Sequence, residues 1–140
     1  MKHKIPRRLV VGMIAAVPLI AQADNLTGTE RFLCASTQVT LCDAYWGCDS
    51  GPPSLWNMPS FIQVDLAKKT LSTPRTSAEQ RRSPFTHLAR DNGRIFIQGM
   101  ENGRAFSLVI VEETGAASLA LALDGSTVTI FGACTPGSWT

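Results

Sequence analysis

The four cysteines are the residues of this chain with the most definite chemistry. An even number of cysteines points to disulfide bonds formed in an oxidising compartment, and the set is Cys34, Cys42, Cys48 and Cys134. Four cysteines allow three pairings. We favour Cys42–Cys48, which clasps a small loop, and Cys34–Cys134, which ties the first strand to the last. The second bond closes a loop of about 100 residues and is worth up to about 4–5 kcal/mol in the chain-entropy model.

A zinc site is the alternative use of the cysteines. Zinc sites built on cysteine usually contain Cys-x-x-Cys pairs, and this chain has none. Histidine is the other common ligand, but His87 is distant from the cysteines in sequence, and His3 lies in the leader segment described below. We therefore expect no metal ion and no other cofactor.

The sequence contains no motif that indicates a catalytic site. A nucleophilic triad requires Ser or Cys, His87 and an acid to meet in space, but the Gly-x-Ser-x-Gly motif is absent and the cysteines are expected to be oxidised. The carboxylates are scattered and show no paired-acid signature. We expect no catalytic residue and predict that the protein is not an enzyme.

The segment 43–59 is the strongest candidate for a binding loop. It contains three prolines, two glycines, the only tyrosine and two of the three tryptophans. Long ordered loops often carry function, so we predict that Tyr45, Trp46 and Trp56 stack on a sugar or another planar ligand. In the alternative interpretation, Trp46 and Trp56 close one end of the fold as a small satellite core.

Charge is distributed unevenly along the chain. The segment 68–94 has a net charge of +5, whereas the rest of the chain beyond residue 23 has a net charge of −7. Within the basic segment, Arg75, Arg81 and Arg82 are candidates for contact with an anionic envelope surface, a lipid head group or an acidic protein. The alternative is a solvated loop with ordinary surface charge.

Short strands and tight turns must position these residues. Apolar and polar residues alternate from Phe61 onward, and Asn-Gly at 92–93 and at 102–103 predicts type I′ hairpin turns. Turn glycines recur every ten to twelve residues, at Gly93, Gly103, Gly115 and Gly125. We expect strands at 61–66, 85–90, 94–98, 104–112, 116–123 and 126–134, a further strand starting at 70–72, and a loop or one short helical turn over 74–83.

This pattern predicts an all-β fold. No long segment has the 3.6-residue period of a helix, and the strands follow one another almost without interruption. We predict an antiparallel β-meander of about eight strands, stapled by disulfides and forming a small up-and-down barrel or a sandwich. Gly99 and Gly132 fall inside strand patterns and are interpreted as bends or bulges.

Residues 1–23 have the pattern of a secretory signal peptide. Basic residues precede an uncharged stretch over 9–20, and Ala21-Gln22-Ala23 matches a small-x-small cleavage site. Twelve residues span about 18 Å as a helix, which is short of the roughly 30 Å hydrocarbon core of a membrane. We therefore expect cleavage, one β domain over 24–140, no transmembrane segment thereafter, and a periplasmic or secreted location.

Cleavage changes the charge of the protein. The whole chain has 13 basic and 11 acidic residues, but four of the basic residues lie in the signal peptide. The remaining chain has a net charge of −2, so its overall basicity offers no argument for nucleic-acid binding.

One long run of the chain resembles known proteins. The run from Phe61-Ile62-Gln63-Val64-Asp65-Leu66-Ala67-Lys68-Lys69 to Ile130-Phe131-Gly132-Ala133-Cys134 is similar to small exported proteobacterial proteins of unassigned function. That resemblance implies export and a β-rich fold. A looser, architectural similarity links the chain to the periplasmic C-type lysozyme inhibitors, which are small disulfide-tied barrels, although their Ser-Gly-x-Arg-Tyr type motif is absent.

The sequence therefore predicts an exported, non-enzymatic β-barrel module that binds an envelope protein, a glycan or an anionic surface. One alternative is a small hydrolase acting on envelope glycans or lipids, which would need a cleft with converging carboxylates or His87. A lysozyme-inhibitor-like periplasmic protein is another. A lipocalin-like carrier would need an apolar cavity, and with about 117 residues and short strands we expect the interior to be filled by side chains.

Overall fold

The computed structural model describes residues 24–139, and the predicted signal peptide over 1–23 lies outside the described residues. Strands and one short 3₁₀ helix, η1, make up the described part of the chain. In order they are β1 (Arg31–Asp43), β2 (Gly47–Gly51), η1 (Pro53–Trp56), β3 (Phe61–Asp65), β4 (Thr70–Ser72), β5 (Arg82–Pro84), β6 (His87–Asp91), β7 (Arg94–Glu101), β8 (Arg104–Val111), β9 (Ala116–Leu123) and β10 (Ser126–Pro136).

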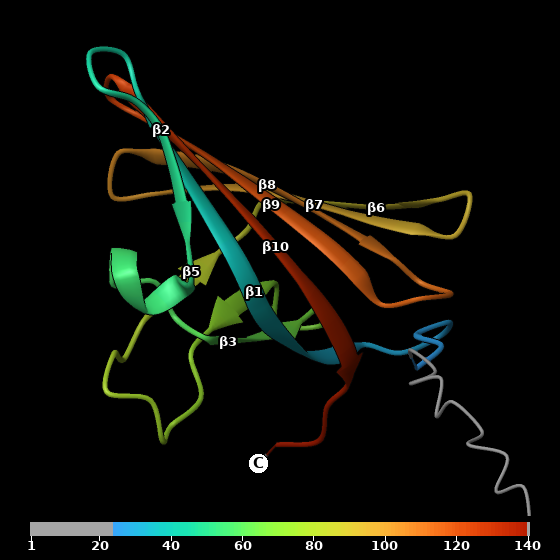
Figure 1. The fold of residues 1–140 in the computed structure, drawn as a ribbon. Coiled ribbons are helices and arrows are strands. Elements are labelled where there is room, and N and C mark those ends of the chain that lie inside the picture. Colours follow the sequence, from blue (N-terminus) through green and yellow to red (C-terminus); the bar gives the residue numbers. More distant parts are fainter. Residues whose placement is uncertain (1–23, 140) are drawn as a thin grey trace, which may run out of the picture.

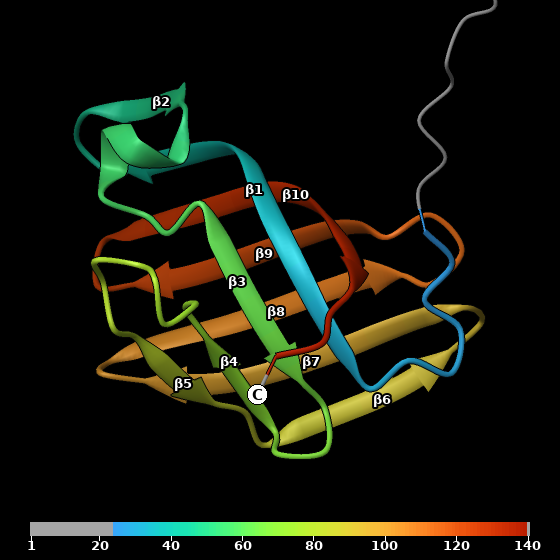
Figure 2. The ribbon, with the colours of Figure 1, turned by 90° about the horizontal axis from the view of Figure 1, so that it is seen from below.

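The strands form one antiparallel sheet that curls into a half-barrel. Its order is β5-β4-β3-β1-β10-β9-β8-β7-β6, and β2 pairs with the far half of β1. Figure 2 shows β1, β3 and β4 crossing over β7, β8 and β9, so that one part of the sheet covers the other. The predicted all-β, antiparallel, disulfide-stapled fold is therefore confirmed, with ten strands where about eight were expected.

The core lies between the two crossing parts of the curled sheet. Alternate residues of β7 and β8, such as Ile95, Ile97 and Ile110, are fully buried, and they meet Phe32 of β1 and Val64 of β3 in one cluster. Each such side chain contributes roughly 1.5–3 kcal/mol by its removal from water. The period-two alternation seen in the sequence thus selects the inward face of β7 and β8.

The hairpin turns follow the predicted chemistry. Asn92 and Gly93 have φ of 47° and 70°, and Asn102 and Gly103 have φ of 47° and 73°. Positive φ at both central residues is the type I′ conformation, whose twist matches that of the flanking strands. The Asn-Gly pairs therefore set the β6–β7 and β7–β8 connections by local chemistry.

A bulge bends β1 where it faces Gly132 of β10. The register of β1 against β10 shifts between Ser36 and Gln38, and a Cβ atom at Gly132 would lie 2.2 Å from the carbonyl oxygen of Ala35. Only glycine fits this close approach of two backbones. The bulge therefore lies in β1, directly opposite the Gly132 position that was interpreted from the sequence as a bend or a bulge.

Gly99, interpreted from the sequence as a bend or a bulge, is not a bulge. β7 and β8 pair in continuous register through this residue, whose missing Cβ would meet the Phe106 ring at 2.6 Å. Gly99 instead leaves room for Phe106 and for the carbonyl oxygen of Pro84.

Several elements also differ from the prediction. Residues 47–51 form β2 rather than loop, because Cys42 and Cys48 face each other as a cross-strand pair. Residues 82–84 form β5, paired with β4, in the stretch predicted as loop over 74–83. β6 begins at His87 rather than at residue 85, because the backbone N–H of Phe85 donates to the carbonyl oxygen of Lys69.

Both disulfides join residues that lie directly opposite each other on adjacent antiparallel strands. Cys34–Cys134 connects β1 to β10, and Cys42–Cys48 spans the β1–β2 hairpin, which is the pairing favoured from the sequence. The first bond joins residues 100 positions apart, whereas the second joins residues only 6 apart. In the chain-entropy model these loops are worth about 4–5 and about 2 kcal/mol.

We predict that the Cys34→Ala/Cys134→Ala variant loses about 2 kcal/mol more stability than the Cys42→Ala/Cys48→Ala variant, because it frees the longer loop. Urea denaturation of the two variants and the wild type measures the difference. Equal losses of stability in the two variants would contradict the prediction that Cys34–Cys134 stabilises the fold more than Cys42–Cys48 does.

Candidate functional site

The tip of the β1–β2 hairpin presents two aromatic side chains to solvent. Tyr45 is 90% exposed and Trp46 is 91% exposed. Figure 1 shows this hairpin projecting beyond the body of the sheet, next to the turn between β9 and β10. Apolar side chains that are exposed next to each other, rather than singly, mark interaction sites, so this tip is the first candidate site.

Covalent and polar contacts hold the tip in one shape. Cys42–Cys48 closes its base, and the Asp43 carboxylate accepts hydrogen bonds from the backbone N–H groups of Tyr45 (2.8 Å) and Trp46 (3.3 Å). The N–H of Ala44 donates to the carbonyl oxygen of Gly125 at 3.2 Å, which anchors the tip to the β9–β10 turn. The predicted long loop is thus a braced hairpin.

Trp56 lies in a different environment from Trp46. It belongs to η1, is half-buried and packs against the core, with its indole nitrogen enclosed and without a hydrogen-bond partner among residues 24–139. The alternative in which both tryptophans form a satellite core is wrong for Trp46, which is exposed. Within the predicted aromatic set, only Tyr45 and Trp46 share one surface.

The surroundings of the tip are acidic. Asp43 and Asp49 lie on the two strands of the hairpin, and Asp124 lies in the adjoining β9–β10 turn. Residues 32–67 and 105–139, which supply these strands, contain no Lys, Arg or His. The tip therefore combines two aromatic rings with three carboxylates and no cation from these segments.

A cavity of about 500 Å³ opens near the same end of the sheet. Its walls come from both parts of the curled sheet and mix apolar with polar residues; the apolar ones include Ile62, Leu71, Phe106, Leu119, Leu121 and Ile130. The expectation of an interior filled by side chains is therefore wrong at this end. At the opposite end, the fully buried Leu26 helps to fill the interior.

The rim of this cavity is rich in arginine. Arg81 and Arg82 of the predicted basic set line it, together with Arg104 and Glu101 from the β7–β8 hairpin, which sequence reasoning missed. Arg75 is exposed and outside the lining. The Asn-Gly turn at 102–103 predicts that Glu101 lies opposite Arg104. The sequence gives no sign that both residues line the same cavity as Arg82.

The rim cations differ in how far they are neutralised. Arg81 donates to the carbonyl oxygen of Asn57 at 3.1 Å. A hydrogen bond from the Ser77 hydroxyl, followed by a backbone hydrogen bond and the charge of Arg81, lowers the pKa of Glu79 below its ordinary value, so Glu79 stays ionised near Arg81. Within residues 24–139, neither Arg82 nor Arg104 is part of an ion pair.

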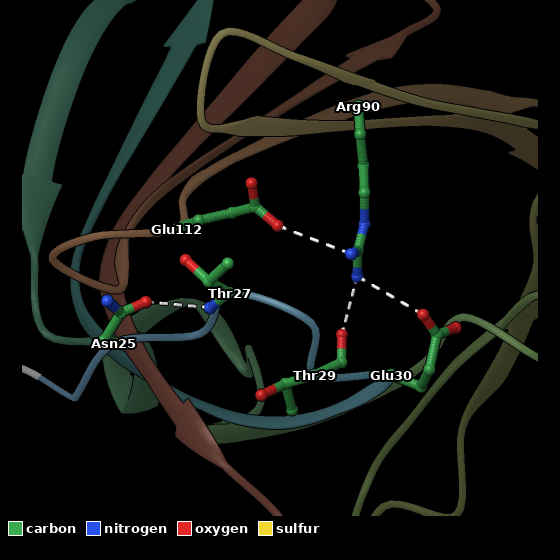
Figure 3. Close-up of polar contacts among 6 residues, drawn as sticks. All are labelled: Asn25, Thr27, Thr29, Glu30, Arg90 and Glu112. Carbon is green, nitrogen blue, oxygen red and sulfur yellow. Dashed lines mark hydrogen bonds and ion pairs between the residues drawn. The ribbon is translucent and has the colours of Figure 1, made fainter.

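Arg90, at the opposite end of the sheet, has a structural role. Figure 3 shows its guanidinium group between Glu112 and Glu30, at 3.6 and 3.4 Å, with a further hydrogen bond of 2.6 Å to the carbonyl oxygen of Thr29. These contacts tie β6 to the segment 24–30, which the N–H of Leu26 also fastens to Glu112. Arg90 therefore closes this end of the fold by holding the segment 24–30 and Glu112 against β6.

Other chemistry-bearing residues do not gather into a site. His87 is exposed on β6 and does not line the cavity, where Glu101 is the one carboxylate in the lining. In the part of the chain that the structure covers, no three His, Cys, Asp or Glu side chains are grouped so as to hold a metal ion. Over residues 24–139, no helix has the length and apolar character needed to cross a membrane.

Comparison with known proteins gives no match, either among family models or among curated proteins. The resemblance to small exported proteobacterial proteins therefore stays a prediction.

We predict that Arg90→Ala lowers the free energy of unfolding by about 1–3 kcal/mol, because the mostly buried Glu112 loses its cation and Thr29 loses a charged donor. Arg94→Ala is the matched control. It lies in the same hairpin, is exposed, and donates one long hydrogen bond of 3.4 Å to Asn92, so we expect a change within about 0.5 kcal/mol. Urea denaturation measures both, and similar losses would refute the closing role of Arg90.

Proposed function

We propose that this protein is an exported, non-enzymatic module that binds a basic protein of the cell envelope through the tip of its β1–β2 hairpin. The observation that carries the proposal is the pair Tyr45 and Trp46, about nine-tenths exposed on a braced and projecting turn. Tryptophan and tyrosine are among the residues that most often dominate binding energy at protein interfaces.

The size of these side chains supports a protein-sized contact. Each aromatic side chain buries roughly 150–250 Å² when covered, which corresponds to roughly 4–6 kcal/mol before the costs of association. The disulfide and the Asp43 hydrogen bonds lower those costs, because the turn is ordered before it meets a partner.

Charge supports a basic partner. Asp43 and Asp49 lie on the two strands of the hairpin and Asp124 lies in the adjoining β9–β10 turn, and residues 32–67 and 105–139 contain no basic residue. Lys and Arg of a partner would pair with the carboxylates and lie over the rings, where cation–π attraction adds to the contact. An anionic surface would be repelled by the three carboxylates of the tip itself.

Export and lack of catalytic activity are parts of the same proposal. The signal-peptide pattern and the two disulfides support an oxidising, non-cytoplasmic location. The cavity is lined by a single carboxylate and not by His87, which supports binding over hydrolysis.

Site-specific photo-crosslinking tests the proposed interface. A photoreactive amino acid replaces Trp46 in one variant and Met100 in another, because Met100 is also strongly exposed, at 77%, but lies on β7. In envelopes of the source cells, we expect a covalent adduct with one basic protein from position 46 and none from position 100. Excess wild-type protein should compete, whereas Tyr45→Ala/Trp46→Ala should not. Equal labelling from both positions would overturn the proposal.

We predict that Trp46→Ala weakens binding to the crosslinked partner by about 30-fold or more, as expected for a residue at the centre of an interface. Met100→Ala is the control, and we expect it to change neither affinity nor melting temperature. Isothermal titration calorimetry measures the affinity. A Trp46→Ala variant that binds as tightly as wild type would show that the tip is not the contact.

A further inference from the structure

We propose that the cavity between the two parts of the curled sheet binds a single-chain anionic amphiphile, a molecule with one apolar chain and a carboxylate or phosphate head group. This site is separate from the hairpin tip and does not rest on the function proposed for the tip. Its volume of about 500 Å³ falls within the range of small-molecule sites in proteins.

The walls of the cavity fit an apolar chain. Ile62 and Leu71 come from β3 and β4, and Phe106, Leu121 and Ile130 face them from β8, β9 and β10. A smaller void of about 30 Å³ continues inward between Cys34, Val64 and Leu108, and its lining is almost wholly apolar. Apolar surface left facing water is unfavourable, so a chain that fills this space gains the free energy of its removal from water.

The rim fits an anionic head group. Arg82 lies on β5 and Arg104 on β8, so two strands that are distant in sequence bring two guanidinium groups to one opening. Arg81 lies beside them but is held by Asn57 and lies near Glu79. Glu101 offsets one rim charge and also accepts a hydrogen bond from Ser83. Three arginines against one lining carboxylate leave an excess of positive charge at the rim, and guanidinium binds carboxylate and phosphate in two-point geometry.

The rest of the fold favours one chain entering from one side. Leu26 and the Arg90 ion pairs close the opposite end, and Cys34–Cys134 holds β1 against β10 at the inner end of the cavity. The opening lies between β5 and the β7–β8 hairpin, where the curled sheet is not joined by a strand ladder. A head group at this opening would meet the arginines while its chain points inward.

The test measures binding of four twelve-carbon probes to the purified protein by isothermal titration calorimetry below their aggregation concentrations. Dodecanoate and dodecyl phosphate carry the anionic head, dodecylamine carries a cationic head, and dodecyl maltoside is neutral. We expect one molecule of either anionic probe to bind, and binding to weaken as salt is raised, because the rim charges are partly exposed. Acetate and inorganic phosphate should not bind, since they lack the chain.

Matched variants connect the binding to this cavity. Arg82→Gln/Arg104→Gln removes both unpaired rim cations, and we expect dodecanoate binding to weaken about ten-fold or more. Arg75→Gln/Arg94→Gln makes the same change in net charge at exposed positions outside the lining and should leave the affinity unchanged. Leu121→Trp fills the space and should abolish binding. If Leu121→Trp fails to fold, backbone NMR shifts on dodecanoate binding serve instead, and we expect them at Ser83, Glu101 and Leu121.

Several results would overturn the proposal. They are equal affinity for dodecylamine or dodecyl maltoside, binding of inorganic phosphate as tight as that of dodecyl phosphate, or the same loss in both double arginine variants. NMR shifts confined to residues outside the cavity would do so as well. Tyr45→Ala/Trp46→Ala should bind dodecanoate normally, so the failure of one proposal is distinguishable from the failure of the other.

Discussion

The antiparallel pairing of β1 with β10 is the interaction on which the rest of the structure depends. These strands come from opposite ends of the described chain, and they pair from Phe32 opposite Pro136 to Asp43 opposite Ser126, with Cys34–Cys134 as a covalent rung. Their pairing joins the two ends of the meander. The free edges of the sheet therefore fall to β5 and β6, which are consecutive in the chain. Because the first and last strands pair with each other, the open edges of the half-barrel are strands from the middle of the sequence.

Both candidate sites follow from the length of β1. Its first half pairs with β3, which brings β3 and β4 over β8 and β9 and encloses the cavity. Its second half continues past the cavity, pairs with β2 and carries Tyr45 and Trp46 away from the body of the sheet. The bulge near Ser36, made possible by Gly132, separates these two halves. One strand thus supports an apolar cavity with a basic rim and an aromatic tip with acidic surroundings.

Local chemistry explains which parts of the fold were predictable. Asn92-Gly93 and Asn102-Gly103 require positive φ, and period-two alternation orients β8 and β9, so these elements follow from neighbouring residues alone. β2 and β5 escaped prediction because short strands with few apolar residues, such as Gly47–Gly51 and Arg82–Pro84, exist through their partners in β1 and β4. Gly99 escaped because the Phe106 side chain that needs the space belongs to the next strand.

The sequence by itself determined the fold class, the turn positions and the unusual aromatic content of the segment 43–59, and it favoured one of three disulfide pairings. Each depends on residue type and short-range spacing, or on the simple expectation that first and last strands meet. Only the tertiary structure decided that Trp46 is exposed while Trp56 is packed, that Arg90 closes one end, and that Arg82 and Arg104 meet at a cavity. These outcomes depend on how a long strand bends and which strands cross, and such geometry arises from contacts between residues that are distant in the chain.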